Sequence, residues 1–257
     1  MRYYVMADIH GFCTLMQKAL KGAGYYEDNG PKKLIICGDL MDRGKEALKV
    51  QQFVLDHMHA GDIILVRGNH EDLAMELLNG WDMCSYAEHH HITNGTLDTA
   101  LQLTHTPSTS VMMTDLDGVR DAFERTPYVQ EIIPSMLDYY ETKDYIFVHG
   151  WIPCYAIQMS KYSRMYLPRE NWKHASRKEW YEARWINGME ACHAGVRENK
   201  TIFCGHYHCS YGHAMYEGVG EELGKDAVFT PYYDTGIVAI DACTAYSGIV
   251  NCVVVEQ

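Results

Sequence analysis

Residues 34–44 read Leu34-Ile35-Ile36-Cys37-Gly38-Asp39-Leu40-Met41-Asp42-Arg43-Gly44. A short apolar run changes here into a turn in which glycines flank two aspartates and an arginine. Because glycine lets the backbone turn sharply, one short loop can project three charged side chains. The stretch therefore predicts a buried strand whose carboxyl end carries chemically useful groups.

Four further apolar runs have the same form, each followed at once by polar or glycine-rich residues; they span residues 3–6, 63–66, 145–148 and 201–204. Between the first three strands, apolar residues recur at helical spacing over 15–23 and 47–58. Alternating strands and helices predict an α/β fold in which central β-sheets are flanked by helices. In such folds ligands gather beyond the carboxyl ends of the strands.

Two longer stretches interrupt this alternation, at about residues 73–140 and 155–199. We expect both to be mainly helical insertions within a single catalytic domain covering residues 1–257. The β-rich runs at 236–240 and 249–255 predict a closing antiparallel pair. The first insertion contains a run of three histidines, at 89–91, which could bind metal, but which we interpret as a solvated or incidental tract because no cysteine or carboxylate pattern accompanies it.

The composition excludes several classes of protein. The chain has 257 residues, of which 47% are hydrophobic and 22% charged, as in ordinary globular proteins. Its net charge of −12 would repel nucleic acid and anionic membranes, so we expect neither as a partner. An acidic protein that handles phosphorylated substrates needs concentrated local positive charge, which bound metal ions can supply.

The N-terminus and the cysteines indicate the compartment. Asp8 and His10 interrupt the N-terminal apolar stretch before it reaches signal-peptide length, and no run of 18 apolar residues follows. Nine cysteines, none in a Cys-x-x-Cys pair, indicate reduced and mostly buried thiols. We therefore expect a soluble, cytoplasmic protein.

All five predicted strands end in metal-binding or proton-transferring residues. Besides residues 38–44, the ends are Asp8-Ile9-His10-Gly11, Arg67-Gly68-Asn69-His70-Glu71, His149-Gly150 and Gly205-His206-Tyr207-His208. Taken singly the motifs are weak: Asp8 and His10, two apart on extended backbone, can face one cation or form an ordinary surface pair, and Asp42 can cap the next helix. Five ends converging on one rim are what a two-metal hydrolytic centre requires.

This ordered set of motifs resembles the calcineurin-like metallophosphoesterases over about residues 1–240. It is most similar to the serine/threonine phosphoprotein phosphatases, especially their small bacterial and phage members. The resemblance implies the metallophosphoesterase type of layered α/β sandwich and a dinuclear metal centre. It assigns the first ion to Asp8 and His10, the bridging position to Asp39, and the second ion to Asn69, His149 and His206.

His208 fits a pattern of the wider superfamily, in which a second histidine of the last motif binds the first ion; the alternative is a histidine outside the ligand set. Oxygen and imidazole ligands together suit transition ions, with manganese first and iron or zinc as alternatives. The resemblance further implies direct attack on phosphorus by a hydroxide that bridges the two ions.

The resemblance also assigns the remaining roles at the site. His70 would be the general acid, oriented by Asp42, and the alternative for His70 is a third ligand of the second ion. Arg43 and Asn69 would bind the phosphoryl group, although Arg43 could also form a surface salt bridge. Arg184 is the candidate for a second phosphate-binding arginine, against a helix-face arginine packed on aromatic rings.

The activity implied is hydrolysis of phosphomonoesters, first of all phosphoserine and phosphothreonine in proteins. A small phosphoester is the alternative partner. Hydrolysis of a nucleotide such as diadenosine tetraphosphate, or of a phosphodiester, is a second enzymatic hypothesis. A module that binds a phosphorylated ligand without turnover is the hypothesis outside enzymology.

Overall fold

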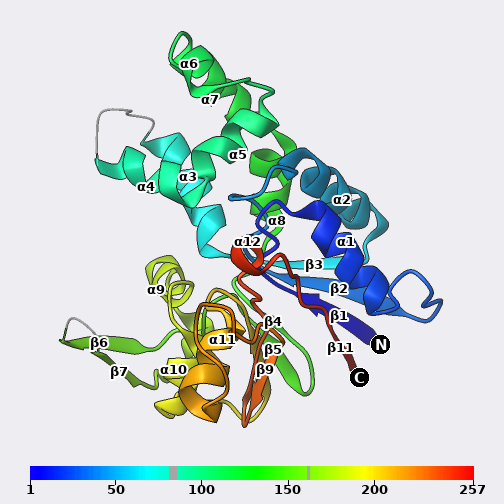
Figure 1. Cartoon of the computed structure of the whole chain (residues 1–257), viewed down its shortest axis with the longest axis vertical. Helices are drawn as coiled ribbons and strands as arrows, with labels where there is room; N and C mark the ends of the chain where they lie inside the picture. The colour runs from blue at the N-terminus through cyan, green and yellow to red at the C-terminus, as the bar shows by residue number, and fades with distance from the viewer. Residues whose placement is uncertain (81–85, 161–162) are drawn as a thin grey trace.

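The computed structural model of the protein describes residues 1–80, 86–160 and 163–257. Two β-sheets lie between two layers of helices (Figure 1). The first sheet has the order β11-β1-β2-β3 and consists of β1 (Arg2–Met6), β2 (Lys32–Cys37), β3 (Ile63–Val66) and β11 (Val253–Glu256). The second has the order β4-β5-β8-β10-β9 and consists of β4 (Tyr140–Glu141), β5 (Tyr145–Phe147), β8 (Thr201–Cys204), β9 (Tyr232–Asp234) and β10 (Ile237–Ala239).

Alternation along the strands divides the apolar side chains between the layers. On β1, Tyr3 and Val5 belong to the cluster shared with Phe147 and Phe203 of the second sheet, whereas Tyr4 belongs to the cluster on the helical side. The helices α1 (Cys13–Gly22) and α2 (Ala47–Ala60) cover the first sheet. The second sheet is covered by α9 (Arg177–Ala183), α10 (Gly188–His193) and α11 (Cys209–Gly212). The predicted layered α/β sandwich is confirmed.

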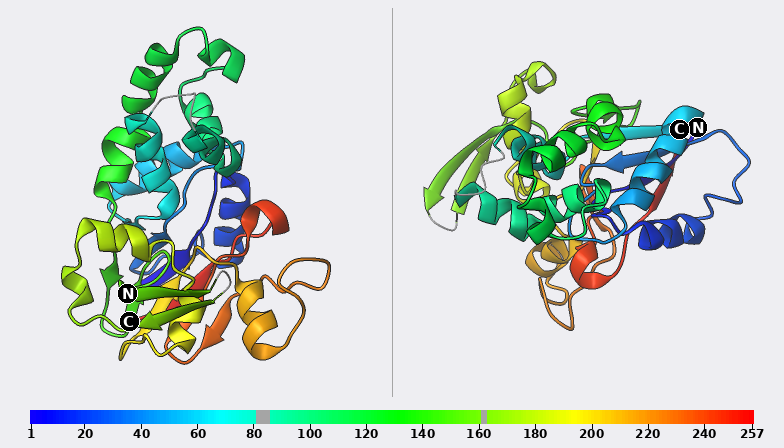
Figure 2. Two further views of the ribbon diagram at one scale, coloured as in Figure 1. Left: turned by 90° about the vertical axis from the view of Figure 1, so that its left-hand side faces the viewer. Right: turned by 90° about the horizontal axis from the view of Figure 1, so that it is seen from above.

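The first insertion is helical, as expected; part of it packs in the core on the first sheet, and the rest extends beyond the sheets (Figures 1 and 2). Its helices are α3 (Asn69–Asn79), α4 (Tyr86–Asn94), α5 (Thr96–Leu103), α6 (Thr109–Met112), α7 (Leu116–Glu124), η1 (Tyr128–Ile132) and α8 (Ile133–Ser135). Within the histidine run, His90 is exposed but His91 is buried, so His91 is not solvated, and only the interpretation of an incidental tract remains open for it. The side chain of His89 lies outside the described residues.

The second insertion departs from the expectation. It begins with a two-stranded antiparallel sheet of β6 (Tyr155–Ser160) and β7 (Ser163–Leu167), and helical structure follows only from η2 (Trp172–His174) onward. The apolar residues Tyr155, Ile157 and Met159 are two apart, which is the period of a strand and not of a helix. The prediction of a mainly helical segment was therefore wrong for its first part.

The predicted closing antiparallel pair is also wrong. β10 pairs with β8 and β9 in the second sheet, whereas β11 pairs antiparallel with β1 in the first. The intervening chain, which includes α12 (Thr244–Ser247), crosses from one sheet to the other. Strand 253–256 thereby joins the end of the chain to its beginning, where the Met1 ammonium group donates to the Gln257 carbonyl.

Two further features bear on the composition. The eight cysteines of the described residues are all free, and five of them are buried; Cys84 lies outside the described residues. No helix in the described part of the chain has the length and hydropathy needed to cross a bilayer.

Candidate metal centre

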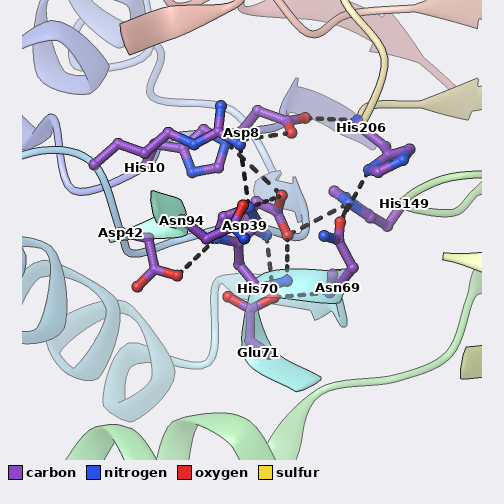
Figure 3. A network of polar contacts seen from close by, with 12 residues as sticks. Asp8, His10, Asp39, Asp42, Asn69, His70, Glu71, Asn94, His149 and His206 are labelled. Atoms are coloured by element: carbon purple, nitrogen blue, oxygen red, sulfur yellow. Dashed lines mark hydrogen bonds and ion pairs between the residues drawn. The ribbon is translucent and has the colours of Figure 1, made fainter. Parts of the chain in front are cut away.

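The loops that follow β1, β2 and β3 of the first sheet meet those that follow β5 and β8 of the second (Figure 3). Two hydrogen bonds join the sheets at this edge. The backbone N–H of His206 donates to Asp8 Oδ2 at 3.0 Å, and His149 Nδ1 donates to the Cys37 carbonyl at 2.8 Å. The expected convergence of the five strand ends is thus present.

The backbone at these loops is left-handed. Of the nine non-glycine residues with positive φ in the described chain, six belong to the strand ends: Asp8, His10, Asp39, Asp42, Arg43 and His206. Such conformations cost about 1–3 kcal/mol each and persist only where surrounding contacts fix them. Here the loops hold one another, because His10 N–H donates to the Asp39 carbonyl at 2.9 Å.

Asp8 and His10 do not lie on the extended backbone that the sequence analysis expected. Their φ angles are 54° and 49°. Their side chains nevertheless face each other, with His10 Nε2 3.8 Å from Asp8 Oδ1.

Gly38 allows the strand ends of the two sheets to approach closely. Its φ is +81°, and a Cβ atom there would lie 2.6 Å from both His149 Nδ1 and Gly68 Cα. Contacts that short do not occur between such atoms, so any larger residue would separate the two loops. The glycine of the predicted turn is therefore required by packing as well as by backbone conformation.

One group of donors that could hold a metal ion consists of His10, Asp39 and His70; it contains His70 and not Asp8, which the family resemblance assigns to the first ion. The Nε2 atoms of both histidines lie 3.8 Å from Asp39 Oδ2. His10 Nδ1 is 3.1 Å from the Met41 carbonyl, which favours the tautomer with the proton on Nδ1 and leaves a lone pair on Nε2.

A second group consists of Asp39, His149 and His206. His149 Nε2 lies 3.4 Å from Asp39 Oδ1 and 2.7 Å from Asn69 Oδ1. His206 Nδ1 is 2.9 Å from the same Asn69 oxygen. Asp39 thus presents Oδ2 to the first group and Oδ1 to the second, as a carboxylate shared by two ions would.

The electrostatics of the buried side chains suit cations. Burial lowers the pKa of His10 and His149 below the ordinary value and that of His206 to about 3, so these imidazoles are neutral and can bind a metal. Burial and the nearby carboxylates of Asp241 and Asp39 raise the pKa of Asp8. Two transition-metal ions would neutralise the buried carboxylates, which repel one another, and would accept the lone pairs of the neutral imidazoles.

His70 and Asp42 form a buried pair. His70 Nδ1 lies 2.6 Å from Asp42 Oδ2, and each side chain is 2% exposed. Burial alone would lower the pKa of His70, but the charges of Asp39 and Asp42 outweigh it and raise the pKa. Asp42 does not cap the following helix, because Glu46 occupies the N-cap position of α2.

Arg43 is exposed at the rim of this pair. Its Nη2 atom lies 3.3 Å from His70 Nε2. Within the described residues the side chain of Arg43 contacts His70 and forms no salt bridge with a carboxylate, so the alternative of a surface salt bridge has no support. The guanidinium group remains available to an anionic ligand beside His70.

His208 lies apart from both donor groups. Its Nε2 atom is 3.1 Å from Glu222 Oε1, and its ring stacks on Tyr207. The left-handed backbone at His206 turns the chain, and His208 becomes the residue that precedes α11. The geometry favours the alternative of a histidine outside the ligand set, and the ligand role of His208 stays a prediction.

Arg184 is engaged by acids. Its Nε lies 2.6 Å from Asp72 Oδ2, and its Nη1 lies 2.9 Å from Asp138 Oδ1. The side chains of Arg184 and Asp72 are only 7% and 8% exposed. A phosphate contact would require this buried pair to break, so the geometry favours a structural role for Arg184, and phosphate binding by Arg184 stays a prediction.

We expect Arg184→Met to lower the free energy of unfolding by about 2 kcal/mol, because the buried Asp72 carboxylate loses one of its two arginine partners and keeps only Arg67, whose Nε lies 2.8 Å from Oδ1. Urea denaturation of the variant, with Arg177→Met at the exposed start of the same helix as control, measures the effect. Unchanged stability together with weaker competitive inhibition by inorganic phosphate would restore the phosphate-binding role.

Glu71 has a supporting role that the sequence analysis did not assign. Its buried carboxylate accepts hydrogen bonds from the backbone N–H groups of Gly68, Asp39 and Leu40, at 2.8–3.1 Å. Burial and the charge of Asp39 raise the pKa of Glu71 to about 7. The sequence could have indicated this role, because Glu71 directly follows Asn69 and His70 in the same motif.

Neutral imidazoles lie beside a carboxylate that faces two donor groups, at the edge of a two-sheet sandwich. This combination is typical of metal-dependent hydrolases of phosphate esters, which is the class of protein that the fold and the site indicate. The profile of the calcineurin-like phosphoesterases matches residues 1–230. The chain belongs to the calcineurin-like phosphoesterase family, whose members are metal-dependent phosphoester hydrolases with a dinuclear metal centre.

Individual relatives are more distant. The chain is 33% identical over 86 residues to the asymmetrical bis(5'-nucleosyl)-tetraphosphatase PrpE of Bacillus subtilis and 31% identical over 86 residues to that of Bacillus velezensis. The alignments cover 31% of this chain and 35% and 34% of those proteins, so the chain matches about a third of the length of these relatives.

Among solved structures, the cold-active protein-tyrosine phosphatase of a psychrophilic Shewanella species has a TM-score of 0.51 at 15% identity. The match covers 100% of this chain and 75% of that one. At this identity the likeness shows a shared fold.

Proposed function

We propose that the protein hydrolyses phosphomonoesters of aliphatic alcohols, and that phosphoserine and phosphothreonine in proteins are its substrates. The observation that carries the proposal is the buried His70–Asp42 pair, with 2.6 Å between Nδ1 and Oδ2. An aliphatic alkoxide is a strongly basic leaving group and needs a proton as it departs. A nucleotide leaves as a weaker base and needs such an acid less.

The chain's own residues supply the remaining parts. Two ions, manganese in the first instance, would be held by Asp8 and His10, by Asp39 between them, and by Asn69, His149 and His206. When bound, they supply activation of water near neutral pH and binding of phosphate oxygens.

As the acid, His70 would carry the transferable proton on Nε2. In the structure this atom accepts from Arg43 Nη2 at 3.3 Å, so the guanidinium group has to turn from the imidazole to the phosphoryl oxygens for the proton to be held there. Asp42 accepts the Nδ1 proton and thereby orients the ring. Arg43 donates two hydrogen bonds to the phosphoryl oxygens and keeps its charge throughout.

A second candidate is hydrolysis of dinucleoside tetraphosphates. It is favoured by the sequence similarity to two bis(5'-nucleosyl)-tetraphosphatases, which is confined to 86 aligned residues. This second activity would use the same metal centre as phosphomonoester hydrolysis. The two activities differ in the group that binds beside the metal ions, a nucleotide in one case and a peptide in the other.

The decisive measurement is the kcat/KM ratio of the manganese-loaded protein for a phosphoserine peptide and for diadenosine tetraphosphate. We expect the peptide to be preferred. A large preference for the dinucleotide would replace the first proposal by the second. Stoichiometric manganese binding without hydrolysis of either substrate or of p-nitrophenyl phosphate would indicate a ligand-binding module.

A further inference from the structure

The first turns of α5 lie against the loop that carries Asp42 and Arg43. Thr96 Oγ1 donates to Asp42 Oδ2 at 2.8 Å, and Thr99 Oγ1 donates to Asp42 Oδ1 at 2.6 Å. The backbone N–H of Asp42 in turn donates to Thr99 Oγ1 at 3.0 Å. Both carboxylate oxygens therefore have partners: His70 and Thr96 on Oδ2, and Thr99 on Oδ1.

The same face of α5 holds the rest of the loop. Thr96, Thr99 and Gln102 are three residues apart and so line one side of the helix. Gln102 donates to the Gly44 carbonyl at 2.9 Å and accepts from the backbone N–H of Ala47 at 3.1 Å. The helix thus holds the loop from Asp42 to the start of α2.

Backbone conformation shows that this contact is needed. Asp42 and Arg43 have φ angles of 75° and 61°, two successive left-handed residues that carry side chains. The conformation persists only where neighbouring groups fix it. Gly95, directly before α5, has no Cβ, and a Cβ there would collide with the Arg43 backbone nitrogen.

We propose that Thr96 and Thr99 are positioning residues for the proton donor. The terminal torsion of an aspartate is broad, so an unsupported Asp42 carboxylate would rotate away from the imidazole. Two hydroxyl donors, both fully buried, fix the rotation that places Oδ2 opposite His70 Nδ1.

The inference rests on the proposed function, because it requires His70 to be the general acid. It gives the first insertion a part in the chemistry: the threonines act through Asp42 and need not touch the substrate.

The test removes the hydroxyl group and keeps the shape. For the manganese-loaded Thr99→Val variant, we expect kcat for a phosphoserine peptide to fall about tenfold, the value of one hydrogen bond to a charged group. We expect kcat for p-nitrophenyl phosphate, whose leaving group needs little protonation, to change less than about twofold. Thr99→Ser should restore the peptide rate, and the bound manganese per chain should stay unchanged in both variants.

A double-mutant cycle with His70→Asn separates positioning from general damage. If Thr99 acts through His70, Thr99→Val has no further effect on the peptide rate once His70 is replaced. Thr126→Val is the matched control, since Thr126 is a buried threonine of the same insertion that donates to the Phe123 carbonyl away from the site. If Thr99→Val does not fold, Thr96→Val removes only the bond to Oδ2 and tests the same point.

Equal losses for both substrates, or an undiminished effect in the His70→Asn background, would overturn the positioning role. Equal losses for both substrates in His70→Asn itself would overturn the proposed acid as well. If His70→Asn lowers mainly the rate for the phosphoserine peptide but Thr99→Val lowers the rates for both substrates equally, only the positioning role is refuted.

Discussion

Asp39→Asn is expected to remove both metal ions together and to lower kcat/KM by more than about 100-fold. Its Oδ2 faces His10 and His70, and its Oδ1 faces His149, so one substitution weakens two donor groups. Even partners that only orient metal ligands contribute about 10–100-fold to metal affinity, and a shared ligand contributes more. Elemental analysis after dialysis against a fixed free manganese concentration measures the ions retained per chain.

Asp56→Asn is the matched control, because Asp56 lies exposed on α2 and bonds only to the nearby Gln52 among the described contacts. Two full equivalents of manganese bound by Asp39→Asn with unchanged affinity would contradict the bridging position. Loss of one equivalent alone would assign Asp39 to a single ion.

His70→Asn is expected to lower kcat for the phosphoserine peptide by about 10²–10⁴-fold, the usual contribution of a positioned general acid. For p-nitrophenyl phosphate the loss should stay below about tenfold, because nitrophenolate departs without a proton. Asparagine can still donate a hydrogen bond to Asp42, so the loop should keep its conformation. Steady-state rates over a series of leaving groups of different basicity measure the effect.

The control for this variant is His59→Asn, at the exposed end of α2. His70 also lies within the first donor group, so the manganese content must be measured in parallel. If His70→Asn loses metal and its activity falls equally for all leaving groups, His70 is a ligand, and the proton must come from elsewhere.

Several parts of the fold and of the candidate site were predictable because each is local. A strand and the turn that follows it are adjacent in sequence, so a motif such as residues 38–44 contains both the buried run and the groups at its end. The same holds for Asn69 and His70 at the start of α3. The family resemblance added the order of these motifs along the chain, which matches the family profile over residues 1–230.

Other predictions depended on distant partners, which the sequence pattern does not reveal. Arg184 looked available for phosphate in sequence, but Asp72, 112 residues away, holds it. His208 shares a motif with His206, yet Glu222 binds its ring. Residues 253–256 look like the partner of the preceding strand, but they pair with the first strand of the chain.

The sequence by itself determined which side chains stand at the ends of the strands, since periodicity and turn chemistry act over a few residues. Tertiary structure alone decided that the Asp8 carboxylate meets the His206 backbone across 198 residues and that Thr99, 57 residues from Asp42, supports its carboxylate. A polar helix face has the same sequence pattern whether it contacts water or a loop. Only the packing of α5 against the loop that follows β2 distinguishes the two cases.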